Sequence, residues 1–125
     1  MKKIAVLFVC LGNICRSPAA EAIFINLLEK KGLTDGFIVD SAGTGSWHIG
    51  KKADSRMRIA AERRDINILS RARQITSEDF GKFNYILAMD DSNFRNIQDL
   101  KNRTSSTDFS LIQKIQMIQS MFYLL

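Results

Sequence analysis

The stretch FVCLGNICRSP, at residues 8–18, constrains the fold of this chain more than any other. It closes a continuous apolar run over residues 4–9, as expected for a parallel strand that is buried on both faces. Ser17 is the expected N-cap of a helix, and Pro18 suits the first helical position because its missing N–H costs nothing there. We therefore expect a strand, a tight loop and a helix in direct succession.

The loop between this strand and this helix is suited to hold an anion. Gly12 and Asn13 tolerate the left-handed backbone angles of a tight turn, so that N–H groups can converge at the helix start. Cys10 lies at the base of the loop, and Arg16 supplies a planar fork that matches a tetrahedral oxyanion. Such surroundings favour the thiolate form of a cysteine. The pattern predicts a nucleophilic thiolate beneath a bound phosphate, although a cysteine at a strand end is by itself most often a small buried hydrophobe.

The rest of the sequence alternates between helical and strand patterns. Apolar residues at helical spacing follow the loop as far as Lys30, and Asp54 or Ser55 is expected to open a second helix. The further expected elements are a short strand over 37–39, a short helix after the capping-box residues 76–79, a buried strand over 85–89 and a helix around 94–100. This alternation predicts a three-layer α/β/α fold with a parallel sheet between helices. Residues 110–125 fit a helical stripe, whereas 114–121 also fit a strand, and periodicity leaves both open.

Composition bounds the class of protein. With 125 residues, 46% of them apolar and 25% charged, the chain is expected to form one globular domain over residues 1–125. The apolar run near the N-terminus is far shorter than a membrane span, which predicts a cytoplasmic protein without a membrane partner. The two cysteines are expected to be reduced, and they are too few for a metal site. The net charge of +5 comes from scattered basic residues, which favours the steering of anionic ligands over nucleic-acid binding.

Three segments resemble the low-molecular-weight protein tyrosine phosphatases. VCLGNICRSPAAEAIF is similar to the phosphate-binding loop and first helix of that family, and DSAGTGSWHIGKKADSR resembles its second strand and substrate loop. RARQITSEDFGKFNYILAMDDSN is similar to the segment that leads into its third strand, so that the likeness covers about residues 3–100. The resemblance implies a four-stranded parallel sheet with the phosphate loop after the first strand. It also implies hydrolysis of phosphotyrosine proteins or small aryl phosphates, with inorganic phosphate as product and with no metal or cofactor.

The resemblance assigns chemical roles within the loop. Cys10 would attack phosphorus and form a cysteinyl-phosphate, while Arg16 and the loop amides stabilise the transferring group. Independently of the resemblance, Cys15 lies in the same tight loop as Cys10, so it is expected to trap the oxidised nucleophile as a disulfide. The alternative, that Cys15 is simply packed behind the loop, stays open. The expected phosphate-binding residues are Leu11, Gly12, Asn13, Ile14, Cys15, Arg16 and Ser17.

Other residues are expected to support this chemistry. Asn13, Ser17 and Ser41 match residues that hold the shape of the family's loop and support its thiolate. Trp47 matches an aromatic residue that lines the family's substrate cleft, whereas the lone His48 is expected to be a surface or hydrogen-bonded loop residue.

The sequence departs from the family pattern in one respect. Family members carry an Asp-Pro-Tyr sequence whose aspartate protonates the leaving phenolate, whereas the one proline of this sequence is Pro18. We therefore expect the family's general-acid loop and final helix to be lacking, and with them the proton donor. The competing expectation is that Asp90, Asp91 or Asp108 supplies the proton, although Asp90 and Asp91 are equally suited to cap a helix. Two alternatives stay open: a non-catalytic module that binds phosphate or phosphoproteins, and arsenate reduction. The second is less favoured because no cysteine follows Cys15 to relay a disulfide.

Overall fold

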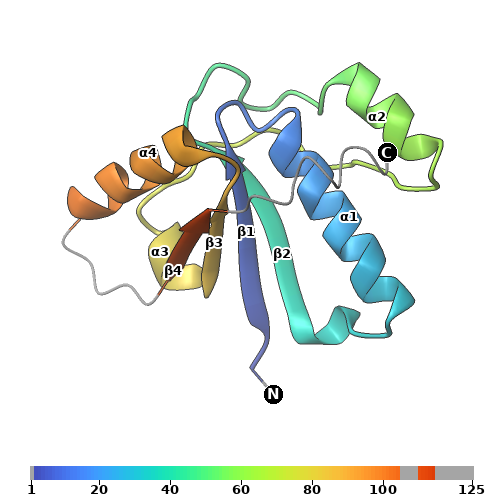
Figure 1. The fold of residues 1–125 in the computed structure, drawn as a ribbon, viewed down its shortest axis with the longest axis horizontal. Helices are drawn as coiled ribbons and strands as arrows, with labels where there is room; N and C mark the ends of the chain where they lie inside the picture. Colours follow the sequence, from blue (N-terminus) through green and yellow to red (C-terminus); the bar gives the residue numbers. More distant parts are fainter. Residues whose placement is uncertain (1, 105–109, 115–125) are drawn as a thin grey trace.

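Four strands form one parallel sheet in the computed structural model, which describes residues 2–104 and 110–114 (Figure 1). The strands lie in the order β2-β1-β3-β4, which places β1 between β2 and β3. In chain order, the elements are β1 (Ile4–Cys10), α1 (Arg16–Lys30), the 3-10 turn η1 (Thr34–Gly36), β2 (Phe37–Gly43), α2 (Ser55–Glu62), α3 (Asp79–Lys82), β3 (Tyr85–Ala88), α4 (Asp91–Asn102) and β4 (Leu111–Lys114). This arrangement confirms the predicted α/β fold with a four-stranded parallel sheet.

Both faces of β1 are buried because its side chains alternate between two cores. Leu7 packs in one core cluster with Ile97 of α4 and with residues of α3. Phe8 points to the opposite face, where its ring meets Phe24 of α1 edge to face, with ring centroids 5.8 Å apart. α1 therefore covers one face of the sheet, whereas α3 and α4 cover the other (Figure 1).

The starts of two helices differ in how well the sequence predicts them. The prediction that Ser17 caps α1 is wrong, because the helix begins at Arg16 and Cys15 occupies the N-cap position. The prediction for α2 is confirmed, since the carboxylate of Asp54 accepts the amide hydrogens of the first turn. α2 packs on the outer side of α1 rather than on the sheet, through a small cluster that contains Ala19 and Ala61.

Two strands have bounds that periodicity did not predict. β2 runs to Gly43 rather than ending at Val39, because it stays in register with β1 through the pair Cys10 and Gly43. β4 occupies Leu111–Lys114, so it begins before the segment 114–121 that fitted a strand pattern. The remainder of that segment lies outside the described residues.

The carboxyl ends of three neighbouring strands meet at one edge of the sheet. Cys10 pairs with Gly43 where β1 and β2 end, and Asp90 follows the end of β3. Parallel strands bind their ligands beyond such an edge. The loops that leave these three strands therefore surround one candidate site.

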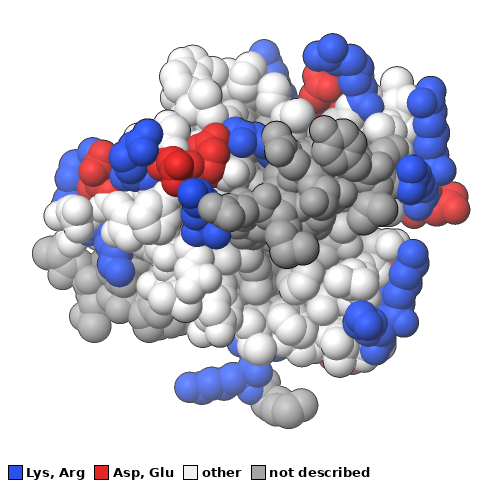
Figure 2. All heavy atoms as spheres, in the orientation of Figure 1, with Lys and Arg blue, Asp and Glu red and all other residues white. Residues whose placement is uncertain are grey.

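Charged side chains are dispersed over the face of the molecule drawn in Figure 2. Among the described residues on that face, Lys and Arg lie at several separate places, and Asp and Glu side chains lie beside some of them. Within the described part of the chain, no helix is both long enough and apolar enough to cross a bilayer.

Candidate active site

The loop from Cys10 to Arg16 is pressed against the end of β2. The amide of Thr44 donates to the Cys10 carbonyl at 2.9 Å, and the amide of Gly45 donates to the Leu11 carbonyl at 2.8 Å. A side chain at Gly43 would bring its Cβ to 2.7 Å from the Leu11 oxygen, which is closer than real Cβ atoms approach. Glycine at this position lets the loop close tightly over the strand end.

The N-terminus of α1 is open toward this loop. Cys15, at the N-cap position, makes no side-chain hydrogen bond to the first turn. The first amides of a helix otherwise lack partners, and the helix dipole makes this end attractive to an anion. The helix start and the loop together therefore offer N–H donors to a bound phosphate.

Asn13 holds the loop in its shape. Its backbone is left-handed, with φ of 56°, and its side chain is almost fully buried. The side-chain oxygen accepts the amide hydrogen of Arg73 at 2.9 Å, which fixes the orientation of the amide group. Its nitrogen therefore faces two hydroxyl groups and donates to Ser17 at 2.9 Å and to Ser41 at 3.0 Å. The structure thus brings together the three residues that were expected to support the loop.

These hydrogen bonds set the direction in which the two hydroxyl groups donate. Since Asn13 donates to Ser17, the Ser17 hydroxyl has its own hydrogen left to donate, and Cys10 Sγ at 2.9 Å is a nearer acceptor than the Ala42 carbonyl oxygen at 3.4 Å. The backbone amide of Asn13 also donates to Sγ, at 3.2 Å. Two donors thus converge on the sulfur, and both stabilise a thiolate.

The hydroxyl group of Ser41 leads in the opposite direction, to Glu21. Ser41 accepts from Asn13 and donates to Glu21 Oε1 at 2.5 Å. Burial raises the pKa of Glu21, although the hydroxyl groups of Ser41 and Ser70 favour its charged form. Sequence reasoning missed Glu21, because a glutamate on the polar side of a helix gives no signal of a contact with β2.

Arg16 extends from the first turn of α1 to the loop after β3. Its Nη2 atom lies 2.9 Å from Asp90 Oδ2, and the other oxygen of Asp90 accepts the amide hydrogen of Asn93 at 2.7 Å. Although partial burial opposes the charge, the Asn93 amide and the Arg16 guanidinium lower the pKa of Asp90. Asp90 therefore caps α4 and positions Arg16 at the same time. Of the other substitute donors considered, Asp91 pairs with Lys114 at 2.6 Å, and Asp108 lies outside the described residues.

Arg73 holds the segment that supports Asn13. Its guanidinium makes two parallel bonds of 3.1 Å to the buried carboxylate of Asp79 and one of 3.0 Å to Asp40. Its backbone amide is the donor to Asn13. Sequence reasoning missed this group too, because its members lie far apart along the chain.

Cys15 and Ile14 form the outer part of the loop. Cys15 is exposed and Cys10 is buried, and both are free thiols. Although the residue is exposed, partial burial of its sulfur, followed by the charge of Asp54, raises the pKa of Cys15. The amide of Asp54 donates to the Ile14 carbonyl at 2.6 Å, which ties the start of α2 to the loop.

Two side chains of the loop after β2 contact residues of the loop 10–16, here called the phosphate loop after its proposed role, or their neighbours. The ring of Trp47 lies directly over Gly45, where any Cβ would overlap it, and the residue is 68% exposed. Trp47 and Leu11 line a cavity of about 300 Å³ that is closed on its other side by α4. His48 packs against Gly12, and its buried Nδ1 atom has no partner among the described residues.

Comparisons with known proteins agree on one family. A family model described as low molecular weight phosphotyrosine protein phosphatase matches residues 5–120. A protein of that name from Schizosaccharomyces pombe is 50% identical over 105 residues, which make up 83% of this chain and 67% of the yeast protein. The chain spans about two thirds of the length of this relative and of its counterpart from Sus scrofa.

Solved structures give the same result. A protein tyrosine phosphatase from Entamoeba histolytica, in a product state mimic, matches with a TM-score of 0.82 and 45% identity, over 90% of this chain and 70% of that chain. The structure of an arginine phosphatase from Drosophila matches with a TM-score of 0.84 and 38% identity, over 91% of this chain and 70% of that chain.

Proposed function

The chain belongs to the low molecular weight phosphotyrosine protein phosphatase family, and on that premise we propose that it hydrolyses aryl phosphate monoesters, including phosphotyrosine in proteins. The observation that carries this proposal is the convergence of two donors on Cys10 Sγ, the Ser17 hydroxyl at 2.9 Å and the Asn13 amide at 3.2 Å. A merely structural cysteine does not need such donors, whereas a nucleophilic thiolate is stabilised by them.

The proposed reaction has two steps. In the first, Cys10 Sγ attacks phosphorus, the S–P bond forms and the bond between phosphorus and the aryl oxygen breaks. In the second, water attacks phosphorus, the S–P bond breaks and inorganic phosphate leaves. We assign phosphate binding to the amides from Leu11 to Ser17 and to the fork of Arg16, which stabilise the charge on the transferring group without a metal or cofactor.

The leaving aryl oxygen needs a proton, and Asp90 is not suited to supply it. Its lowered pKa and its bond to Arg16 keep it ionised at neutral pH. The sequence contains no Asp-Pro pair that matches the family's general acid. We therefore assign Asp90 a positioning role, and we propose that water supplies the proton to the leaving oxygen.

The substrate proposal rests on the side chains around the loop. Ile14 is apolar and partly exposed, and Trp47 offers an aromatic surface beside the cavity that Leu11 lines. Both suit the flat ring of phosphotyrosine better than a charged guanidinium. The likeness to an arginine phosphatase makes phosphoarginine the competing substrate.

The setting of the reaction is also a proposal. We propose that residues 1–125 act as one domain and that its protein substrates are cytoplasmic. The two free thiols support a reducing compartment.

Hydrolysis of p-nitrophenyl phosphate tests the proposed function. We expect turnover by the unmodified chain and by Cys15→Ser, and none by Cys10→Ser. Tight phosphate binding by folded protein without any turnover would instead select the non-catalytic binding module.

A further inference from the structure

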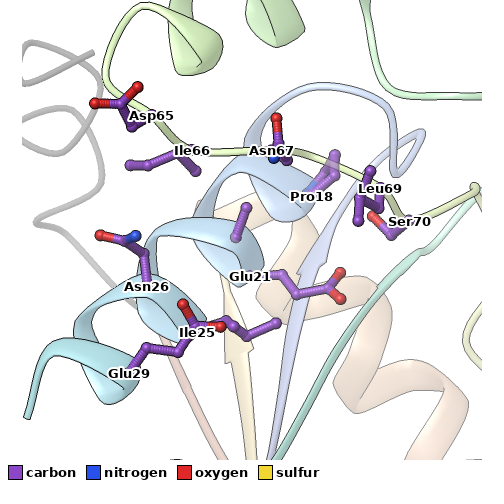
Figure 3. Close-up of a pocket in the computed structure, with 11 residues that line it drawn as sticks. Pro18, Glu21, Ile25, Asn26, Glu29, Asp65, Ile66, Asn67, Leu69 and Ser70 are labelled. Carbon is purple, nitrogen blue, oxygen red and sulfur yellow. The ribbon is translucent and has the colours of Figure 1, made fainter.

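A groove lies behind the phosphate loop, between α1 and the segment 65–70 that follows α2 (Figure 3). Its volume is about 490 Å³, within the range of roughly 300–1,000 Å³ that is usual for small-molecule sites. Pro18, Ile25, Ile66 and Leu69 give it apolar walls. The groove is distinct from the cavity beside Trp47, since the two share no lining residue.

Glu21 is the residue that connects this groove with the loop. In Figure 3 its side chain leaves α1 and extends toward Ser70 at one end of the groove, whereas Asp65 lies at the other end. Among the described residues, no Lys, Arg or His forms an ion pair with Glu21. Arg73 acts on it only from a distance and is already paired with Asp40.

The titratable side chains that line the groove are all acidic. Glu29 and Asp65 accompany Glu21, and no basic residue is among the lining residues, although the chain as a whole carries a net charge of +5. A half-buried carboxylate without a cation is costly, as the raised pKa of Glu21 indicates. The groove thus combines an apolar wall with the carboxylate of Glu21, which has a hydrogen bond from Ser41 but no ion pair among the described residues.

We propose that this groove binds a small organic cation, an ammonium or guanidinium group on an apolar body, whose charge pairs with Glu21 and which thereby acts on the phosphate loop. The apolar body packs against the walls formed by Ile25, Ile66 and Leu69, and the charged head donates to the carboxylate of Glu21. A neutral molecule of the same shape lacks the ion pair, and an anion is repelled.

The hydrogen bonds behind Glu21 give the cation its effect. An ionised Glu21 accepts the hydrogen of Ser41, so that the Ser41 oxygen remains free to accept from Asn13. A protonated Glu21 is a weaker acceptor and can itself donate to Ser41, which competes with Asn13. Since the cation favours the ionised form, it holds Asn13, and through it Ser17, in the orientation that supports Cys10.

Binding can be measured without any enzyme activity. Benzylammonium is titrated into the ¹⁵N-labelled full chain at constant ionic strength, with benzyl alcohol as the neutral control. We expect shifts in the amides of α1 and of residues 65–70 and in the side-chain amide of Asn13. Benzyl alcohol should bind the unmodified chain about tenfold to a hundredfold more weakly than benzylammonium does, because a charge-assisted contact is lost. The variant Glu21→Gln should bind benzylammonium more weakly by a similar factor.

Two further variants keep the test independent of the hydrogen bonds behind Glu21. Asn26→Lys places a tethered ammonium in the groove and is expected to compete with the ligand, whereas Glu62→Gln removes the same charge outside the groove and should change nothing. Equal binding to Glu21→Gln and the unmodified chain, or shifts that map elsewhere, would overturn the proposal.

The effect of the cation on the phosphate loop can be measured in two ways, and only the kinetic measurement rests on the proposed phosphatase activity. Below the pKa of Glu21, saturating benzylammonium is expected to raise kcat/KM for p-nitrophenyl phosphate up to about fivefold, and well above that pKa it should have no effect. The Asn13 side-chain signal reports the same coupling if the chain hydrolyses nothing, so the two proposals fail separately. A cation that fills the groove while the Asn13 signal stays unchanged would contradict the coupling.

Discussion

The guanidinium group of Arg16 lies 2.9 Å from the carboxylate of Asp90, although 74 positions separate the two residues in the sequence. The contact crosses from the start of α1 to the loop after β3, at the edge where the parallel strands end. It holds the guanidinium fork, to which we assign phosphate binding, by an ion pair on one side while Asp90 remains fixed by an α4 amide. Arg16 is thus positioned before a substrate binds, which lowers the entropic cost of the transition state.

Asp90→Asn is expected to lower kcat/KM by about tenfold with little loss of stability, because asparagine can still cap α4 but no longer holds the charge of Arg16. The loss should be equal for p-nitrophenyl phosphate and phenyl phosphate. A greater loss for phenyl phosphate, whose leaving group is poorer, would identify Asp90 as the proton donor.

The pH dependence of this variant follows from the lowered pKa of Asp90. Asp90 stays ionised to lower pH in the folded chain than in the unfolded chain. The ion pair with Arg16 therefore contributes to the stability of the folded site above the unfolded pKa, and this contribution is lost as the pH falls through the folded pKa. The difference in kcat/KM between the unmodified chain and Asp90→Asn should therefore persist at mildly acidic pH. Asp91→Asn is the matched control, since it removes the neighbouring, more exposed charge.

Two substitutions at Asn13 separate its backbone role from its side-chain role. Asn13→Gly keeps the left-handed backbone and removes the amide, so we expect kcat to fall by on the order of tenfold to a hundredfold. Asn13→Ala should lose the same activity and, in addition, about 1 kcal/mol of stability, because a Cβ is disfavoured at positive φ. Measuring kcat and the free energy of unfolding by denaturant titration for each variant checks the two expectations separately. Full activity in Asn13→Gly would show that the hydroxyl directions do not depend on Asn13.

Ile14 is expected to favour phosphotyrosine over phosphoarginine. Ile14→Thr should lower the ratio of kcat/KM for phosphotyrosine to kcat/KM for phosphoarginine by about tenfold. Ile14→Val should change this ratio less, because valine has the shape of threonine without the hydroxyl group. Competition assays with a phosphotyrosine peptide and phosphoarginine measure this ratio. Equal or faster turnover of phosphoarginine by the unmodified chain would refute the substrate proposal.

Cys15 is expected to protect Cys10 from irreversible oxidation. After peroxide treatment, dithiothreitol should restore the activity of the unmodified chain, whereas Cys15→Ser should accumulate sulfinic acid on Cys10. Because burial and then Asp54 raise the pKa of Cys15, bridge formation should accelerate as the pH rises, and Asp54→Asn should speed it at neutral pH. Mass spectrometry that finds no bridge between the two cysteines would exclude this role.

Local patterns predicted the parts of the fold that depend on neighbouring residues. The buried run of β1 and the cap formed by Asp54 could be predicted because each depends on residues close in the sequence. The N-cap of α1 was misjudged because Ser17 gives a capping signal, whereas the tertiary structure uses its hydroxyl for Cys10. Local propensity was overridden by a contact that only the folded loop provides.

The parts that stayed hidden are pairings between distant elements. Arg73 with Asp79, Arg16 with Asp90 and Ser41 with Glu21 depend on the register of parallel strands and on how α1 packs against them. Charged residues on helix faces and in loops are most often solvated, so no local pattern predicted these pairings, even though Arg16, Ser41 and Asp90 were each singled out for another role.

Trapping the covalent intermediate tests the central claim most directly. The chain is mixed with p-nitrophenyl phosphate, quenched within the first turnovers by denaturation, digested and analysed by mass spectrometry. We predict a phosphate adduct on the peptide that contains Cys10, the same adduct site in Cys15→Ser, and neither adduct nor turnover in Cys10→Ser. Turnover that survives Cys10→Ser, or an adduct on any other residue, would contradict the assignment of Cys10 as the nucleophile.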